Sequence, residues 1–503
     1  MKKFTHKLIA LLLCVAMIGS YLPMMANAAG TEVTAVTDTE YTLYPTPHTV
    51  TYGEGSFELK NINAVYGKGI DEYTKARLEE TAALLELSVE ASGETDVYVA
   101  IYGSGDEVEQ YILDNYTVDA SLFNKTDANF VAVNDGEIVV LGKDTDAAFY
   151  GLTTLYQIFG QLEGKEIRNL TINDYADVAS RGFIEGYYGN PWSVEDRANL
   201  MTWGGYYKLN SYFYAPKDDP KHNAKWRELY TEEEIETLIK PLAEAGNKSK
   251  CRFVFALHPY MYNPITDYNY NDSMAIMKAK FTQVIEAGVR QIAILADDAG
   301  NQGGNHYNRM LADMTAWIKE MQKTYPDLKL LLPFVTQEYM GYGQSYYRNF
   351  PENVQIVMTG GQVWGFCSPS FTNSFYNNVG RGVYLWINWP CTDNSKNHLI
   401  MGGYADFLQP GVDPNKVEGI VLNPMQQSEP SKVAIFGNAC YTWNMWETRE
   451  EADKAKKAKK DQNLAAQMAI LEQLKAAQEA EMAAKRAEKA KAEGKEEPKT
   501  EPK

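Results

Sequence analysis

The sequence QIAILADD, from Gln291 to Asp298, is an apolar run that ends in two adjacent carboxylates. Its length, with Gly288 before it and Gly300 after it, is typical of a β-strand that is buried on both faces, as in a parallel sheet. In a β/α barrel, the carboxyl ends of the strands form the face that carries catalytic groups. The stretch therefore predicts a barrel with Asp297 and Asp298 at its mouth.

The adjacent carboxylates Asp297 and Asp298 suit one kind of chemistry. Neighbouring residues of a strand point to opposite faces, so both side chains can reach one ligand only where the strand ends. Two carboxylates held close together resist ionising together, and one should keep its proton near neutral pH. Cleavage of a glycosidic bond needs one acid and one base. Most Asp–Asp pairs are solvated turn residues, so the motif alone leaves both interpretations open.

The composition narrows the class of protein. A chain of 503 residues can form two or three domains, and 45% hydrophobic with 23% charged residues is ordinary for a globular protein. The 34 tyrosines and nine tryptophans suit a protein that handles sugars, because aromatic rings stack on apolar faces while their polar groups form hydrogen bonds. A formal charge of −18 argues against a nucleic-acid partner, since phosphate binding depends on Lys and Arg.

Residues 1–28 have the features of a signal peptide. Lys2, Lys3 and Lys7 precede an apolar run from Leu8 to Ile18, and Ala26-Asn27-Ala28 offers a cleavage site. The apolar run is too short to cross a bilayer, so no membrane span is expected in the mature chain. We expect a secreted protein, with association with the cell surface left open.

The cysteines predict neither a disulfide framework nor a metal site. Export would leave Cys251, Cys367, Cys391 and Cys440, which lack the spacing of either arrangement. No metal and no cofactor are expected.

Three regions follow the signal peptide. Residues 41–175 alternate short strands and helices, which predicts a small α/β domain with a sheet covered on one side and with a hairpin at Asp135-Gly136. Residues 179–446 alternate eight strand candidates with helices, as in a (β/α)₈ TIM-like barrel. Residues 447–503 are rich in Ala, Glu and Lys, which favours a charged helical or disordered tail. The strand candidates begin at Gly182, Ser211, Cys251, Gln291, Leu328, Val354, Gly382 and Gly419.

Six ordered motifs carry a resemblance to a known family: RGFIEGYYGNPWS, FYAPKDDP, ILADD, WINWPCTD, VLNPM and YTWN. Together they resemble glycoside hydrolase family 84, the β-N-acetylglucosaminidases and O-GlcNAcases that are sometimes labelled hyaluronidases. The resemblance covers about Tyr41 to Trp446 and implies a retaining mechanism in which the 2-acetamido oxygen of the sugar attacks its own anomeric carbon. It implies that Asp298 is the general acid and then the base, and that Asp297 orients the acetamido N–H and stabilises the oxazoline intermediate.

The resemblance also implies a set of substrate-binding residues. Gly186 would offer its carbonyl to a sugar hydroxyl beside Tyr188, and Lys217 would bind ring hydroxyls. Asp393 would hold the hydroxyls at C4 and C6, which favours exo-action, with Asn388 and Asn423 as further contacts. Trp386 and Trp443 would wall the acetamido pocket, and Tyr339 would contact the acetamido oxygen.

Plainer interpretations exist for several of these residues. Lys217 could belong to a surface salt-bridging turn. Asn388 and Asn423 could cap turns, and Trp386 and Trp443 could be core. His258, outside the proposed set, is interpreted as a satisfied core histidine.

The predicted function is that of a secreted, retaining exo-β-N-acetylglucosaminidase that releases terminal β-linked GlcNAc from a glycan or glycoprotein. One alternative is an endo-acting hyaluronan or chitin hydrolase, which would need an open groove. Another is a catalytically silent sugar-binding surface protein. The natural glycan, the tolerance for GalNAc and the oligomeric state are left open.

Overall fold

The computed structural model describes residues 39–401 and 404–457, and those from Tyr41 onward belong to one compact unit. The predicted signal peptide and residues 458–503 of the predicted tail lie outside the described residues. The described start of the tail, 449–457, is helical.

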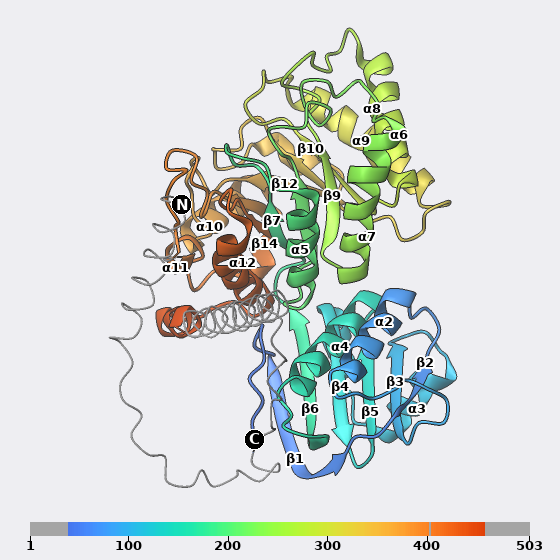
Figure 1. Cartoon of the computed structure of the whole chain (residues 1–503). Helices are drawn as coiled ribbons and strands as arrows, with labels where there is room; N and C mark the ends of the chain where they lie inside the picture. The colour runs from blue at the N-terminus through green and yellow to red at the C-terminus, as the bar shows by residue number, and fades with distance from the viewer. Residues whose placement is uncertain (1–38, 402–403, 458–503) are drawn as a thin grey trace, which may run out of the picture. The chain divides into compact units, whose positions relative to one another are not determined.

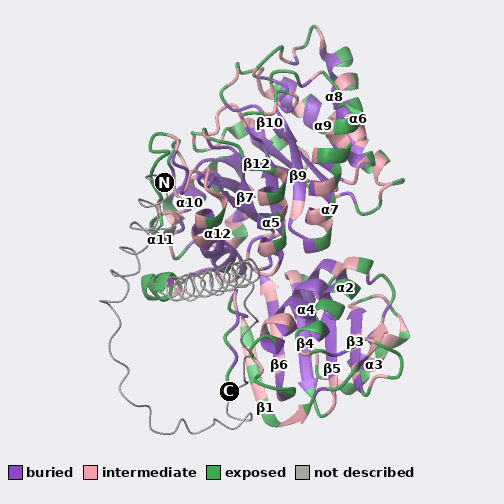
Figure 2. Ribbon diagram, viewed as in Figure 1, coloured by how far each residue is buried: buried purple, intermediate pink, exposed green. Residues whose placement is uncertain are grey.

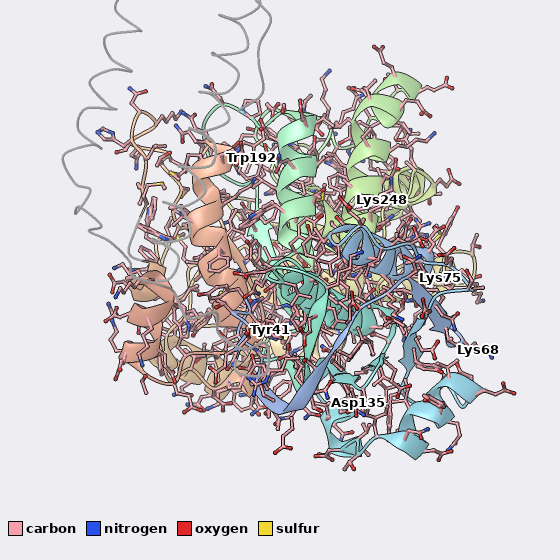
Figure 3. All side chains as sticks on the ribbon, turned by 60° about the horizontal axis from the view of Figure 1, so that its bottom comes forward. Tyr41, Lys68, Lys75, Asp135, Trp192 and Lys248 are labelled. Atoms are coloured by element: carbon pink, nitrogen blue, oxygen red, sulfur yellow. The ribbon has the colours of Figure 1, made fainter. Side chains whose placement is uncertain are left out.

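The first sheet has six strands in the order β1-β6-β4-β5-β3-β2 (Figure 1). Its strands are β1 (Thr49–Glu58), β2 (Ile62–Tyr66), β3 (Thr95–Ile101), β4 (Thr126–Asn134), β5 (Glu137–Gly142) and β6 (Glu166–Ala176), and its helices are α2 (Glu72–Ala83), α3 (Glu107–Asn115), η2 (Ala120–Asn124) and α4 (Thr145–Phe159). The predicted hairpin joins β4 to β5, where Asp135 and Gly136 have φ angles of 37° and 99°. Asp135 is labelled at this turn in Figure 3.

Both faces of this sheet are covered, so the prediction of a single covered face was wrong. Leu78 of α2 and Leu152 of α4 pack on one face. On the other face, Ile112 of α3 and Phe123 of η2 pack in a second apolar cluster. The cover on this face is made of short segments, since α3 has nine residues and η2 five, and part of its packing is a ring stack between Tyr98 and Tyr111, so the sequence did not reveal this layer.

The predicted (β/α)₈ barrel is confirmed. Eight parallel strands close in the order β10-β11-β12-β13-β14-β7-β8-β9, and they are buried within a surround of helices (Figure 2). The strands are β7 (Ser180–Ile184), β8 (Ser211–Tyr214), β9 (Arg252–Leu257), β10 (Gln291–Leu295), β11 (Leu332–Val335), β12 (Val354–Met358), β13 (Val383–Ile387) and β14 (Val417–Leu422). The helical segments are α5 (Val194–Gly205), α6 (Glu232–Glu234), η3 (Ile235–Ile239), α7 (Lys240–Ser249), α8 (Tyr270–Glu286), α9 (Gly304–Met321), η4 (Ser345–Asn349), α10 (Pro369–Val379), α11 (Tyr404–Phe407), η5 (Pro414–Lys416) and α12 (Ser428–Trp443).

Two apolar layers hold the barrel together. Strand residues that face outward, such as Ile292 and Ile294, pack against the helices. Alternate residues face inward and fill the barrel, among them Ala293 and Leu295 of the same strand. Because side chains fill the interior, a ligand can bind only at the mouth.

No helix within the described residues is long and apolar enough to cross a membrane. The cysteines of that part of the chain, Cys251, Cys367, Cys391 and Cys440, are all buried.

Candidate active site

The residues of the candidate site lie just beyond the ends of the barrel strands, at positions that extend the alternation of inward-facing side chains. Leu295 is the last inward core residue of β10, and Asp297 follows two positions later with the same direction along the strand. Trp386 is followed in the same way by Asn388, and Val421 by Asn423. On each of the eight strands, the position two residues after the last inward core residue is a polar residue or a glycine. These residues are Gly186, Lys217, His258, Asp297, Gln337, Thr359, Asn388 and Asn423.

The two adjacent acids reach one cavity because the backbone turns between them. Strand β10 ends at Leu295, and Asp298 has a φ angle of 53°, in the left-handed region that Asp tolerates better than most residues. Asp297 is only 6% exposed, whereas Asp298 is exposed at the mouth. The pair therefore differs in environment, as roles of fixed anion and proton donor would require.

His258 contacts both the backbone and the carboxylate of Asp297. The Nε2 of His258 lies 2.7 Å from the backbone carbonyl oxygen of Asp297 and 3.5 Å from its carboxylate Oδ1. The Nδ1 of the same ring accepts a hydrogen bond from the backbone N–H of Met261, so Nε2 carries the proton and donates. His258 is buried, as the sequence suggested, but it also positions a candidate catalytic residue.

The carboxylate of Asp297 is incompletely paired. Its Oδ1 is buried and has no hydrogen-bond donor among the described residues. A buried acceptor without a donor costs about 1–3 kcal/mol, more when it is charged, and in native proteins it calls for an explanation. A ligand that brings an N–H group to this oxygen would satisfy it.

Tyr339 joins Asp298 to the loop after β11. Its hydroxyl donates to Asp298 Oδ1 at 2.8 Å, and burial together with this carboxylate raises the pKa of the phenol. The neighbouring Glu338 anchors the loop by accepting hydrogen bonds from Tyr346 and Tyr347, at 2.5 and 3.1 Å. The phenol of Tyr339 is thereby held at the carboxylate that the sequence predicts to be the general acid.

The floor of the site is a hydrogen-bonded group around Asn388. Its Oδ1 accepts from Trp386 Nε1 at 2.8 Å and from Asn423 Nδ2 at 3.0 Å. The Oδ1 of Asn423 in turn accepts from the backbone N–H of Gly186 at 3.2 Å. A Cβ at Gly186 would lie 2.4 Å from the Trp386 indole, so only glycine fits there. These contacts fix the indole as one wall of the cavity.

Tyr188, Lys217 and Asp393 form a second part of the cavity wall. The backbone N–H of Tyr188 donates to Asp393 Oδ1 at 3.0 Å, and burial raises the pKa of that carboxyl. The Lys217 ammonium lies 5.0 Å from the centre of the Tyr188 ring. A cation, a carboxyl group and an aromatic face are therefore grouped where sugar hydroxyls could be bound.

These residues line one cavity of about 350 Å³, within the usual range for small-ligand sites. Its lining includes both predicted catalytic residues and most of the predicted binding residues: Gly186, Tyr188, Lys217, Asp297, Asp298, Tyr339, Trp386, Asn388, Asp393 and Asn423. Their individual roles remain predictions. Larger hollows of about 530 and 690 Å³ lie elsewhere on the described surface, but neither has adjacent carboxylates at the end of a strand.

The prediction that Trp443 walls the acetamido pocket was wrong. Trp443 is the last residue of α12, which follows β14 and runs back to the opposite end of the barrel, where the Trp443 carbonyl accepts from the backbone N–H of Asp177 just before β7. Its Nε1 donates to both carboxylate oxygens of Asp174 at 2.9 Å. Of its two interpretations, buried core is correct.

Several residues of the cavity were not singled out from the sequence. Thr359, Val363 and Trp364 follow β12, Cys391 lies within the WINWPCTD segment, and Asn394 follows that segment. Thr359 could have been found by extending the inward pattern of Val357 by two residues. Trp364 has no such signal, because it lies in an irregular loop.

A closed parallel barrel with paired carboxylates at its carboxyl mouth defines the class of barrel glycoside hydrolases. Comparison with known proteins agrees, since residues 181–479 match the family model described as beta-N-acetylglucosaminidase, and residues 40–175 match domain 2 of glycosyl hydrolase family 20. The chain belongs to the β-N-acetylglucosaminidases of glycoside hydrolase family 84, and the predicted resemblance is confirmed.

Two solved structures and two curated relatives show how far the similarity extends. The structure of CpGH84D is 37% identical, with a TM-score of 0.76, over 82% of this chain and 71% of that one. CpGH84B is 28% identical, with a TM-score of 0.72, over 83% and 74%. Protein O-GlcNAcase of Mus musculus and that of Rattus norvegicus are each 27% identical over 52% of this chain. The match spans only 29% of the length of these two relatives.

Proposed function

We propose that the chain is a secreted, retaining exo-β-N-acetylglucosaminidase that uses the 2-acetamido group of its substrate as the nucleophile. The observation that carries the proposal is the buried Oδ1 of Asp297, an acceptor without a donor at the mouth of the barrel. An acetamido N–H is a donor of the right kind for it. Asp298, exposed beside it and bonded to the Tyr339 hydroxyl, is suited to exchange protons with the leaving group.

In the first step, the acetamido oxygen attacks the anomeric carbon while Asp298 gives its proton to the departing oxygen. The products of this step are an oxazolinium ion and a free alcohol, and the carboxylate of Asp297 accepts a hydrogen bond from the acetamido N–H as that group becomes positive. In the second step, Asp298 takes a proton from water, which opens the oxazolinium ion with net retention. An internal nucleophile gains from proximity, with effective molarities of about 10⁵ M or more, and acid–base catalysis adds roughly 10²- to 10⁴-fold.

The arrangement around Asp393 supports exo-action. Asp393, Tyr188 and Lys217 form a polar wall on one side of a cavity of about 350 Å³. Such a wall can bind the hydroxyls of a terminal sugar and leaves less room for a chain that continues past it. The endo-acting alternative predicts that internal linkages of hyaluronan or chitin are cut and that loss of the Asp393 carboxylate does not impair cleavage.

The test is hydrolysis of aryl β-N-acetylglucosaminides with good and poor leaving groups by the wild type, Asp297→Asn and Asp298→Asn. We expect Asp298→Asn to keep activity mainly on the good leaving group, because that group departs without a proton. Asp297→Asn should lose about 10²- to 10⁴-fold on both. Fluorination of the acetamido methyl group should slow the wild type, since it weakens the internal nucleophile.

Asp114→Asn is the matched control, because Asp114 is an exposed residue of α3 whose carboxylate accepts a hydrogen bond from Gln110. It should leave turnover unchanged. Binding of GlcNAc by a wild type that turns over no aryl glycoside would refute the enzyme and support the silent sugar-binding alternative. Export is tested separately, by locating the processed chain in the host medium.

A further inference from the structure

An exposed apolar pair stands at one side of the cavity. Val363 and Trp364 are 39% and 40% exposed, although both line the cavity. They belong to the loop TGGQVWGF, residues 359–366, which follows β12. Single exposed apolar residues are common on protein surfaces, so the pair is informative because of its place in the lining of the cavity.

Hydrogen bonds hold this loop in one shape. The backbone N–H of Thr359 donates to the carbonyl of Tyr339 at 3.0 Å, and the Thr359 hydroxyl donates to the carbonyl of Gln362 at 2.7 Å. The Gln362 amide donates to the carbonyl of Trp364 at 2.9 Å, and the Asn388 amide donates to the carbonyl of Val363 at 2.7 Å. The loop is thus tied to both neighbouring strand ends.

The glycines of the loop make this shape possible. Gly360 and Gly361 have φ angles of 84° and 90°, which other residues adopt only with strain. At Gly365, a Cβ would lie 2.1 Å from the Thr359 carbonyl oxygen, so a side chain cannot be accommodated. The indole is therefore presented on a fixed support, which lowers the entropy cost of binding a ligand against it.

The loop lies on the side of the leaving group. Thr359 bonds to the backbone of Tyr339, whose hydroxyl contacts the proposed acid Asp298. Within the hydroxyl-binding wall, Lys217 follows β8, which lies across the closed barrel from β12, whereas Asp393 follows β13, a neighbour of β12. A sugar bound to that wall, with its anomeric carbon at Asp298, directs its leaving group towards the loop.

We propose that Val363 and Trp364 form a leaving-group subsite for a second pyranose ring, so that the preferred substrate is GlcNAc linked to another sugar. This inference rests on the proposed function and deepens it by naming the substrate class. An indole offers a flat apolar face that matches the C–H face of a pyranose. A peptide backbone would instead need hydrogen-bonding partners, and each of the carbonyls of Gln362, Val363 and Trp364 already uses one of its two acceptor positions within the protein.

The experiment compares kcat/KM for three substrates: the methyl β-glycoside of GlcNAc, a GlcNAc-β-galactose disaccharide, and a peptide carrying GlcNAc on serine. In Trp364→Ala, the ratio of disaccharide to methyl glycoside should fall by about tenfold, and Trp364→Phe should restore most of it because it keeps a ring. Tyr376→Ala on α10 is the matched control, with 39% exposure and no place in the cavity, and should leave the ratio unchanged.

Two results would overturn the subsite. In one, the ratio stays constant in Trp364→Ala. In the other, the peptide loses activity while the disaccharide does not, which would make the loop a peptide contact. If the wild type turns over none of the substrates, the proposed function fails first. The subsite is then decided by calorimetry with Asp298→Asn, in which the disaccharide should bind more tightly than the methyl glycoside, and only while Trp364 is present.

Discussion

Buried carboxylates at the two ends of the barrel differ in how completely the protein satisfies their hydrogen bonds. At the end away from the mouth, Asp174 of β6 is wholly buried and fully paired. Its carboxylate accepts from Lys208 Nζ at 2.9 Å, from Trp443 Nε1 at 2.9 Å and from the His48 ring at 3.3 Å. Burial alone would raise the pKa of Asp174, but Lys208 and these hydrogen bonds together hold it below its usual range.

At the mouth, Asp297 has one oxygen without a donor, and Asp298 lies in a left-handed conformation with its carboxylate exposed. The protein itself supplies the hydrogen-bond donors to the Asp174 carboxylate. The carboxylates of Asp297 and Asp298 leave acceptor positions that a ligand could fill. Burial therefore does not distinguish a structural carboxylate from a functional one. The distinction lies in whether the fold supplies every hydrogen bond that the carboxylate needs.

The largest expected effect comes from making the same isosteric change at each end. Asp174→Asn leaves Lys208 buried without its counter-charge, and should lower the free energy of unfolding by about 3–5 kcal/mol. Asp297→Asn removes an incompletely paired anion and should leave stability unchanged or raise it, while activity is lost. Urea unfolding of both variants measures this contrast. Equal destabilisation by the two changes would show that Asp297 is also a structural acid.

A smaller effect is expected at His258, which belongs to the functional end but does not reach the substrate cavity. His258→Phe removes the donor to the Asp297 carbonyl and should lower kcat by about tenfold, with little change in KM, because the carboxylate is less well oriented. His258→Gln keeps a donor and should recover part of the loss. A rise in KM with an unchanged kcat would argue that His258 shapes the pocket and does not position the acid.

The smallest expected effect is a pH dependence of stability at the paired end. Burial lowers the pKa of His48, but hydrogen bonds to Asp174 and Asp177 outweigh it and raise the pKa to about 9. Because the folded-state pKa is above the ordinary value of 6.5, this stabilisation is fully present below pH 6.5 and is lost as the pH rises through about 9.

His48→Gln should abolish this component. The Tm difference between the wild type and His48→Gln should therefore shrink by about 3 °C between pH 6 and pH 10. Taking the difference between the two proteins cancels groups that titrate in both, such as Lys208, whose pKa is lowered chiefly by burial. A difference that is constant with pH would mean that His48 is not charged in the folded chain.

Much of the fold could be predicted because it follows from local patterns. Apolar runs such as that of Gln291 to Leu295, separated by helical segments, indicate a parallel barrel without reference to any distant contact. The alternation of side chains along a strand then decides which residues face inward, so Asp297 and Asn388 could be assigned to the mouth. The second face of the N-terminal sheet was missed because its cover consists of the short segments α3 and η2, which pack partly through a ring stack.

The sequence by itself determined the alternation of strands and helices, the family, and the residues that end the strands at the mouth. Only the tertiary structure decided that Trp443 lies at the far end of the barrel, that His258 supports Asp297, and that a glycine-dependent loop presents Trp364. The reason is physical: periodicity specifies the face of an element on which a side chain lies. Which groups meet there, and which oxygen is left without a donor, depends on how elements far apart in the chain pack together.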